Sequence, residues 1–405
     1  MSEIRTAPHD ERAATAAAGA RLERNGRAAV IVFLVTEDWY FWSHRLPVAR
    51  AARAAGARVI IATRVEKLGA EIEREGFELV ALPWRRRSHN PWSELRAFLA
   101  IIALYRRERP DIVHHVAIKP VVYGGMAARL AGARIQVNAI AGLGYVETSR
   151  QPRARVLRGV FNSVLRFAWS GTGVHVIVQN PDDRAALSRT GLVPAAHVHM
   201  IRGSGVDVER FVSSPEPPAP PVRAIYGGRL LWSKGIRELV DAARVLRARR
   251  VPVEVVLVGD PDVENPESIP ADAVKSWVRD GLVKHEPWAD DMTSVWRGAH
   301  MAVLPSYREG LPKALLEAAA CGRPLVATEV PGCREIARDG VNALLVPPRD
   351  AGALADAIAK LALDAPLRAR LGAAGREIVV NEYAESIVVK ETLALYRSLC
   401  ATEPR

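Results

Sequence analysis

The stretch from Leu304 to Cys333 constrains the fold of this chain more than any other. In order, it predicts a buried strand at 300–304, a polar loop at 305–312, a helix at 313–320 and a second buried strand at 324–327. Gly322 stands before Pro324, a usual place for the end of a helix. This βαβ order is typical of a parallel sheet covered by helices.

Two glutamates lie in this stretch, Glu309 in the loop and Glu317 in the helix. In one continuous helix their spacing would be about 12 Å. With Glu309 in the loop, both can face one elongated, polyhydroxylated ligand from different ends. Between them the helix start offers N–H groups and a positive dipole end, which suit a phosphate. The alternative is a surface helix that carries two unrelated glutamates.

Composition favours a large soluble protein. A chain of 405 residues with 49% hydrophobic and 25% charged residues is long enough for two domains. No apolar run approaches the ~18–20 residues of a membrane span. Residues 1–27 lack the apolar core of a signal peptide and are expected to form a disordered tail, so we expect a cytoplasmic protein. Cys321, Cys333 and Cys400 lack the paired spacing of a disulfide framework or zinc site.

The excess of positive over negative charge lies in the first half of the chain. Residues 1–205 hold 30 Lys and Arg against 17 Asp and Glu, whereas residues 206–405 hold 26 against 28. The first half is therefore expected to face an anionic surface or acceptor.

The first half alternates apolar runs with helical segments, as a doubly wound α/β domain does. The loop expected at 36–45 has no glycine, which argues against a dinucleotide-binding fingerprint and an NAD enzyme. Its aromatic residues and His44 indicate a binding crevice, or aromatic side chains packed under the next helix. The predicted strands are 28–35, 58–62, 77–82, 111–115, 134–140 and 174–178.

Further polar or small residues follow strands of this half. His114 and His115 are placed at a strand end, where open α/β sheets carry their sites, before Lys119. A lone histidine in such a place is most often structural. Gly142 and Gly144 would allow a ligand close to the backbone after the next strand.

Two basic segments combine arginine with tryptophan and aliphatic residues. Trp84–Arg109 begins with Trp84, Arg85, Arg86 and Arg87. Gln151–Trp169 includes Arg155 and Arg158. Such helices are typical of docking on an anionic bilayer, although each alone could be a helix with a solvated basic face. The window 84–170 holds 15 basic against 4 acidic residues, and we therefore favour the membrane.

The Pro-rich run at 213–222 predicts a stiff linker between two domains. A second α/β domain then opens with a strand at 223–226, followed by a loop with Gly228, Arg229 and Lys234. Two cations beside backbone N–H groups suit a diphosphate, although they could be surface charges. A further strand ends in Asp260 and Asp262, a D-x-D pair that elsewhere holds a metal.

The chain resembles retaining glycosyltransferases of family four, which have the two-domain GT-B fold. The resemblance is carried by Glu309 with Glu317 and by Gly-Arg-Leu…Lys-Gly at 228–235, and it extends weakly from about Ala28 to Ala359. It implies two Rossmann-like α/β domains that face a central cleft, with no metal, so the metal-binding reading of the D-x-D pair is rejected. Further matching motifs are Gly-Leu-Pro (310–312), Ala-Cys-Gly-Arg-Pro (320–324), Val-Pro-Gly-Cys-Arg-Glu (330–335), Asp-Gly-Val-Asn (339–342) and Val-Pro-Pro-Arg-Asp (346–350).

The resemblance also implies roles for particular residues. Arg229, Lys234 and the N–H groups around Gly310, Leu311, Pro312 and Lys313 would bind the diphosphate of a UDP-sugar. Glu309 would hold the donor sugar and Glu317 the ribose. His114 is a candidate catalytic residue, and the acceptor-side candidates are His44, His114, Lys119, Gly142 and Gly144.

The resemblance implies a transferase that moves a sugar, of N-acetylhexosamine type, to a polyprenyl-diphosphate-linked acceptor in capsule or O-antigen assembly. We expect it at the inner face of the cell membrane, with no nucleic acid partner and no cofactor. Alternatives are a transferase with a soluble acceptor and a catalytically silent partner of an assembly complex. The expected domains are 28–212 and 223–382, with a last helix at 383–405 that crosses back to the first.

Overall fold

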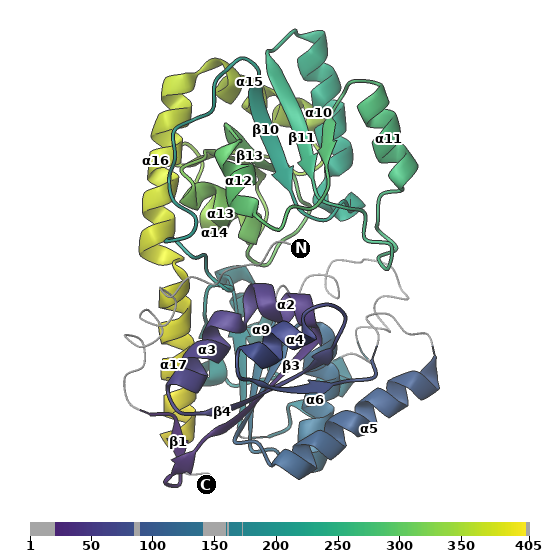
Figure 1. The fold of residues 1–405 in the computed structure, drawn as a ribbon, viewed down its shortest axis with the longest axis vertical. Helices are drawn as coiled ribbons and strands as arrows, with labels where there is room; N and C mark the ends of the chain where they lie inside the picture. The colour runs from purple at the N-terminus through teal and green to yellow at the C-terminus, as the bar shows by residue number, and fades with distance from the viewer. Residues whose placement is uncertain (1–20, 85–89, 141–158, 160–161, 172, 402–405) are drawn as a thin grey trace. The chain divides into compact units, whose positions relative to one another are not determined.

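The computed structural model describes residues 21–84, 90–140, 159, 162–171 and 173–401, and the chain divides into two compact units (Figure 1). Unit 1 comprises the residues up to Ser204 together with those from Ser386 onward. Unit 2 comprises Gly205–Glu385. Among the described residues, none of the helices is both long and apolar enough to cross a membrane.

Unit 1 contains a parallel sheet of seven strands in the order β5-β4-β3-β6-β7-β8-β9. The strands are β3 (Val30–Glu37), β4 (Arg58–Arg64), β5 (Glu78–Ala81), β6 (Ile112–Val116), β7 (Ile135–Ala139), β8 (Val174–Val178) and β9 (Val198–Met200). The helices described are α2 (Asp38–His44), α3 (Leu46–Ala54), α4 (Gly69–Arg74), α5 (Pro91–Glu108), α6 (Ile118–Ala131), α9 (Pro181–Thr190) and α17 (Glu385–Ala401), with a 3-10 turn at Ala195–His197.

The central strand β3 is apolar on both faces because helices cover both. Ile31, Phe33 and Val35 pack in the core formed with α3 and α17, and the alternate residues of β3 pack in the core formed with α5 and α6. Side chains of a strand alternate between faces, so an unbroken apolar run is what a sheet covered on both sides requires. The last helix, α17, belongs to unit 1 as expected, and it contributes Leu393 and Tyr396 to that core.

Unit 2 repeats the plan with a parallel sheet of six strands in the order β12-β11-β10-β13-β14-β15. The strands are β10 (Val222–Gly227), β11 (Val253–Val258), β12 (Lys284–Glu286), β13 (Met301–Leu304), β14 (Leu325–Thr328) and β15 (Ala343–Val346). The helices are α10 (Ile236–Ala248), α11 (Ala271–Arg279), α12 (Met292–Arg297), α13 (Lys313–Ala320), α14 (Cys333–Ile336), α15 (Ala351–Leu363) and α16 (Ala365–Glu382), with a 3-10 turn at Trp232–Lys234. The two doubly wound sheets confirm the predicted fold class.

The Pro-rich run at 213–222 is not the boundary between the units, which lies at Ser204 and Gly205. The run belongs to unit 2, and its last residue already lies in β10. Buried guanidinium groups need hydrogen-bond acceptors, and extended Pro-rich backbone has free carbonyl groups to offer them. The contacts are Arg323 Nη2 to Ser214 Oγ (2.6 Å) and Pro215 O (3.1 Å), Arg368 Nη2 to Glu216 Oε2 (2.8 Å), and His300 Nε2 with Pro217 O (3.1 Å).

Part of the expected N-terminal tail is also ordered. Residues 1–20 lie outside the described residues, but β1 (Glu23–Arg24) and β2 (Arg27–Ala28) form a hairpin, and Leu22 is buried in the core of unit 1. The turn is Asn25–Gly26, and φ is +51° and +72° there. Positive φ at both central residues is what a two-residue hairpin turn requires, and Asn-Gly is its strongest sequence signal. The sequence interpretation overlooked this signal.

The segment expected to be a loop at 36–45 is mostly the helix α2. Its first residue, Asp38, accepts hydrogen bonds from the backbone N–H groups of Glu66, Lys67 and Leu68. Burial by itself would raise the pKa of Asp38, but these bonds and that from Trp39 lower it below its usual value. The carboxylate therefore ties α2 to the loop after β4, a contact that sequence patterns do not reveal.

Candidate active site

The candidate site of unit 2 lies where the strand order of its sheet reverses. The strands β10 and β13 are neighbours, and the chain leaves them in opposite directions along the sheet. Ligands of open α/β sheets bind outside the carboxyl ends of strands at such a point. Arg229 and Lys234 follow β10, and Glu309 follows β13. The topology thus brings together three of the residues predicted from sequence.

Lys234 and Glu309 form a close ion pair, with 2.5 Å between Lys234 Nζ and Glu309 Oε1. The same carboxylate oxygen accepts a hydrogen bond from Ser306 Oγ at 2.6 Å. Both ionised side chains are largely buried, which strengthens their attraction relative to a pair in water. Ser306 was not predicted, and only its spacing of three residues from Glu309 in a loop could have suggested it.

Arg229 precedes Lys234 in the same loop and forms a separate ion pair. Its Nη1 donates to Asp262 Oδ2 at 2.8 Å, and its backbone O accepts from the Tyr226 hydroxyl at 2.7 Å. Burial raises the pKa of Tyr226 well above its usual value, so the hydroxyl remains a donor. Gly228 lies between Tyr226 and Arg229, with φ at +155°.

Two further glycines allow the loops of the site to pack against each other. A Cβ on Gly235 would lie 2.0 Å from the backbone O of Pro305, and φ of Gly235 is +70°. A Cβ on Gly332 would lie 2.4 Å from Gly310 O, and φ is +79°. No β-carbon fits at either place. The loop that holds Glu309 and Gly310 is therefore positioned by backbone contacts with both glycines.

Glu317 is buried on α13, and Trp296 Nε1 donates to its Oε2 at 3.3 Å. Burial raises the pKa of Glu317, and Lys313, the hydrogen bond from Trp296 and Arg210 oppose the rise. Lys313 Nζ lies 4.0 Å from Glu317 Oε1. The residues Gly310, Leu311 and Pro312 lead into α13, and no side chain caps its first turn. The first turn of α13, whose backbone N–H groups are expected to face a phosphate, therefore follows directly after the loop that holds Glu309.

One acceptor-side candidate of unit 1, His114, is placed differently from the prediction. His114 lies in the middle of β6 rather than at its end, and it is buried. Its ring stacks on Phe33, and its Nδ1 contacts the hydroxyl of Tyr396. Burial lowers the pKa of His114 well below its usual value, with smaller contributions from Arg45 and His115. This geometry makes His114 a neutral residue of the core of unit 1, and it does not support a catalytic role.

Lys119 and His44 lie nearer the carboxyl edge of that sheet. Lys119 Nζ donates to Glu94 Oε1 at 3.0 Å and lies over the rings of Trp84 and Tyr123. The His44 ring stacks on Tyr40 with 4.1 Å between centroids. Gly142 and Gly144 lie outside the described residues.

Trp84 is not part of a membrane-facing surface, because only 1% of it is exposed. Its Nε1 donates to Thr36 O at 3.2 Å, and Lys119 covers its ring. Arg85, Arg86, Arg87, Arg155 and Arg158 lie outside the described residues. The sequence showed that Trp84 is followed by arginines but not that α6 would supply a lysine to cover it.

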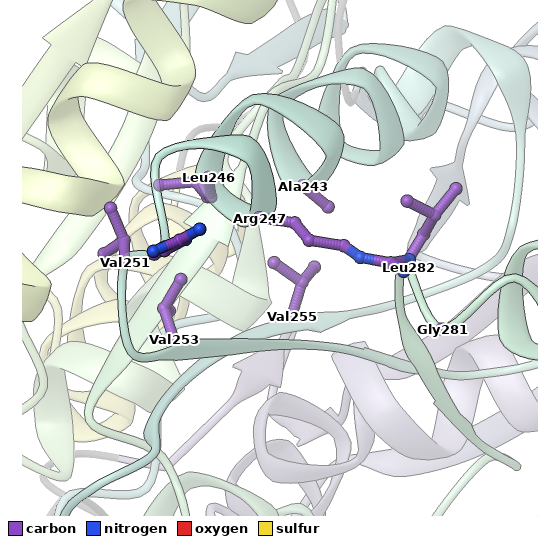
Figure 2. Close-up of a pocket in the computed structure, with 9 residues that line it drawn as sticks. Ala243, Leu246, Arg247, Val251, Val253, Val255, Gly281 and Leu282 are labelled. Atoms are coloured by element: carbon purple, nitrogen blue, oxygen red, sulfur yellow. The ribbon is translucent and has the colours of Figure 1, made fainter.

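Unit 2 contains a cavity of about 280 Å³ (Figure 2). It is lined by the C-terminal part of α10, which includes Arg247, by Arg250, by the start of β11 and by the turn at Gly281. Residues at the start of a strand lie at the opposite edge of a parallel sheet from Arg229 and Glu309. The cavity is therefore separate from the candidate site.

Two family models match the chain. "Glycosyl transferase 4-like" matches residues 30–180, and "Glycosyl transferases group 1" matches residues 221–364. Together they cover the greater part of both units.

Two curated relatives match over most of their length. An "N,N'-diacetylbacillosaminyl-diphospho-undecaprenol alpha-1,3-N-acetylgalactosaminyltransferase" of Campylobacter jejuni is 25% identical over 380 residues, which are 90% of this chain and 98% of that protein. The "Capsular polysaccharide biosynthesis glycosyltransferase CapM" of Staphylococcus aureus is 23% identical over 82% of this chain and 88% of its own length.

A solved structure of HepE from Anabaena, in complex with UDP and glucose, is similar in fold. Its TM-score is 0.71 at 18% identity, over 91% of this chain and 99% of HepE. The doubly wound sheets and these matches define a glycosyltransferase of the GT-B fold. The chain belongs to glycosyltransferase family four, in which its relatives include enzymes of polysaccharide assembly.

Proposed function

We propose that the protein is a retaining, metal-independent transferase that moves a sugar of N-acetylhexosamine type from a UDP-sugar to a polyprenyl-diphosphate-linked glycan. The proposed donor site is supported by the position of Lys234, Glu309 and Arg229, which lie where the strand order of the sheet of unit 2 reverses. Two cations and a carboxylate there match a ligand that carries both a diphosphate and sugar hydroxyl groups. The UDP bound to HepE supports the choice of nucleotide.

The acceptor is proposed from the relatives. The Campylobacter jejuni protein is named for a diphospho-undecaprenol acceptor and an N-acetylgalactosaminyl group. An Escherichia coli relative is likewise named as a diphosphoundecaprenol galactosyltransferase. The net positive charge of residues 1–205 fits an anionic acceptor. A soluble acceptor is the alternative, and it predicts full activity without lipid.

In the proposed reaction the bond between the anomeric carbon and the β-phosphate breaks, and negative charge develops on the departing diphosphate. Lys234 and Arg229 stabilise that charge, since fixed cations act most strongly on charge that grows in the transition state. The departing phosphate takes the proton of the acceptor hydroxyl, and the new bond forms on the face from which the phosphate leaves. No protein nucleophile is needed.

Binding of nucleotide sugars in the presence of excess EDTA tests this proposal. We expect UDP-sugars to raise the thermal midpoint of the protein more than GDP- or ADP-sugars do, with no change on addition of EDTA. Protein cations, rather than a metal ion, would meet the phosphate charge. Loss of binding in EDTA, with recovery on addition of manganese or magnesium, would contradict the metal-independent site and return Asp260 and Asp262 to consideration as ligands.

The exposed face of α5 supports a membrane-surface partner. Trp92, Leu95 and Leu99 are 75%, 44% and 53% exposed, and their spacing places them on one face of the helix. The arginines Arg96 and Arg106 are exposed on the same helix. The opposite face packs in the core of unit 1. An apolar stripe flanked by arginine has the chemistry that an anionic bilayer recognises.

Replacing Trp92 and Leu99 together by serine is expected to reduce binding to phosphatidylglycerol vesicles about tenfold or more. Burying one large apolar side chain contributes roughly 1.5–3 kcal/mol. High salt should also weaken binding, because each Arg near the surface contributes about 1 kcal/mol that salt screens. Co-sedimentation at low and high salt measures both effects.

Leu363 is a matched control, since it is an exposed leucine of unit 2, and Leu363→Ser should bind vesicles as the wild type does. If the wild-type protein stays in the supernatant at low salt, the membrane partner is wrong and a soluble acceptor is favoured.

A further inference from the structure

Asp260 and Asp262, the acidic pair that follows β11, contact different partners. Asp262 Oδ2 lies 2.8 Å from Arg229 Nη1. Asp260 Oδ2 accepts a hydrogen bond from the backbone N–H of Trp288 at 3.3 Å. The geometry therefore connects Asp262, but not Asp260, with a residue of the candidate donor site.

Backbone hydrogen bonds hold the loop of Asp262 against the segment of Arg229. Leu230 N donates to Asp260 O at 3.1 Å, and Ile269 N donates to Leu230 O at 2.9 Å. Trp232 N donates to Glu267 O at 2.8 Å. These bonds lie on both sides of Asp262 in sequence. The carboxylate is thus fixed relative to the backbone from which the Arg229 side chain extends.

Two behaviours of this ion pair are possible when a diphosphate binds. Asp262 could compete with the phosphate for Arg229, or it could keep hold of Arg229 while the phosphate binds the remaining N–H groups. The side chain of Asp262 is 13% exposed, whereas that of Arg229 is 40% exposed. Removing the guanidinium would leave a largely buried carboxylate without this partner, which is costly. Burial therefore favours a pair that persists.

The chemistry of arginine allows a persistent pair. A guanidinium carries five N–H donors in a rigid plane, and the bond to Asp262 uses Nη1. Donors on the other nitrogen atoms can reach an anion while Nη1 stays bonded. A guanidinium fixed in this way loses less conformational entropy when it binds a phosphate than a freely rotating one does.

We propose that Asp262 is a positioning residue that orients Arg229 toward the diphosphate of the donor. The inference rests on the proposed donor site, since it needs Arg229 to contact the nucleotide. In this role Asp262, the second acid of the D-x-D pair, orients the guanidinium group of Arg229.

Calorimetric titration with UDP tests this role in four proteins: the wild type, Asp262→Asn, Arg229→Ala and the double variant. We expect Asp262→Asn to weaken UDP binding about five- to tenfold, and Arg229→Ala about ten- to a hundredfold. The double variant should bind no more weakly than Arg229→Ala, because Asp262 acts only through Arg229. The variant Asp262→Glu, which keeps the charge, should bind UDP more tightly than Asp262→Asn. In transfer assays the KM for the donor should rise more than kcat falls.

Asp272→Asn is the matched control, since Asp272 is an exposed residue of α11 paired with Lys275, and its UDP affinity should equal that of the wild type. Thermal midpoints without ligand separate loss of binding from loss of folding. Tighter UDP binding by Asp262→Asn would identify Asp262 as a competing anion and overturn the proposal. Equal affinity, or additive losses in the double variant, would overturn it as well. Absence of UDP binding by the wild type would refute the donor site and this inference with it.

Discussion

Replacing Lys234 by alanine is expected to lower kcat by about 10²–10³-fold, the effect of removing one donor that stabilises developing negative charge. The affinity for UDP should fall about ten- to a hundredfold, since a hydrogen bond to a charged group contributes roughly 1.5–3 kcal/mol. Lys234 is the residue from which we expect the largest catalytic effect, because its ammonium lies 2.5 Å from Glu309, the proposed ligand of the donor sugar. Measurements of kcat, donor KM and UDP affinity check the prediction.

The loss of kcat and UDP affinity in Lys234→Ala could instead be caused by Glu309, whose carboxylate would no longer be paired with a lysine. The double variant Lys234→Ala with Glu309→Gln removes that stranded charge while Ser306 can still donate to the amide oxygen. If Lys234 binds the diphosphate, the double variant should still bind UDP weakly. Recovery of UDP affinity in the double variant would contradict the role of Lys234. Lys275→Ala, at an exposed lysine of α11, should retain activity.

Replacing Gly235 by alanine is expected to destabilise unit 2 and to weaken nucleotide binding. The new Cβ would lie 2.0 Å from Pro305 O, and the residue would have to keep φ near +70°. Overpacking of this kind costs roughly 1–3 kcal/mol, and a left-handed conformation costs about 1–2 kcal/mol more. The loop must therefore move. Since Lys234 precedes Gly235 and Glu309 follows Pro305 by four residues, the shift would separate the ion pair.

Gly340→Ala is the control for backbone strain alone, since φ is +68° there and a Cβ would meet no atom within 4 Å. We expect it to cost about 1–2 kcal/mol without a change in UDP affinity. Chemical denaturation and UDP titration of both variants give the comparison. Equal stabilities and equal affinities would show that the close contact with Pro305 has no part in positioning the donor loop.

Local patterns in the sequence predict the sheets and much of the candidate site. Strands covered on both faces must be apolar along their buried part, so runs such as Val30–Val35 and Val255–Val258 identify them without knowledge of their neighbours. The helix expected at 313–320 has those bounds in the structure. Its helix-forming residues and the helix-ending Gly322 are local signals, so they can be recognised without knowledge of the rest of the fold. Arg229, Lys234 and Glu309 follow strands, and the strand order then brings Lys234 and Glu309 together.

Only the tertiary structure decided which partner each polar or aromatic side chain has. Trp84 is covered by Lys119 of a later helix, Asp262 is bound by Arg229, and His114 meets Tyr396 from the last helix. The Pro-rich run belongs to unit 2 because arginines far along the chain bond to its backbone and side chains. Burial and ion pairing depend on residues that are distant in sequence, and hydrophobic periodicity and local motifs carry no information about such partners.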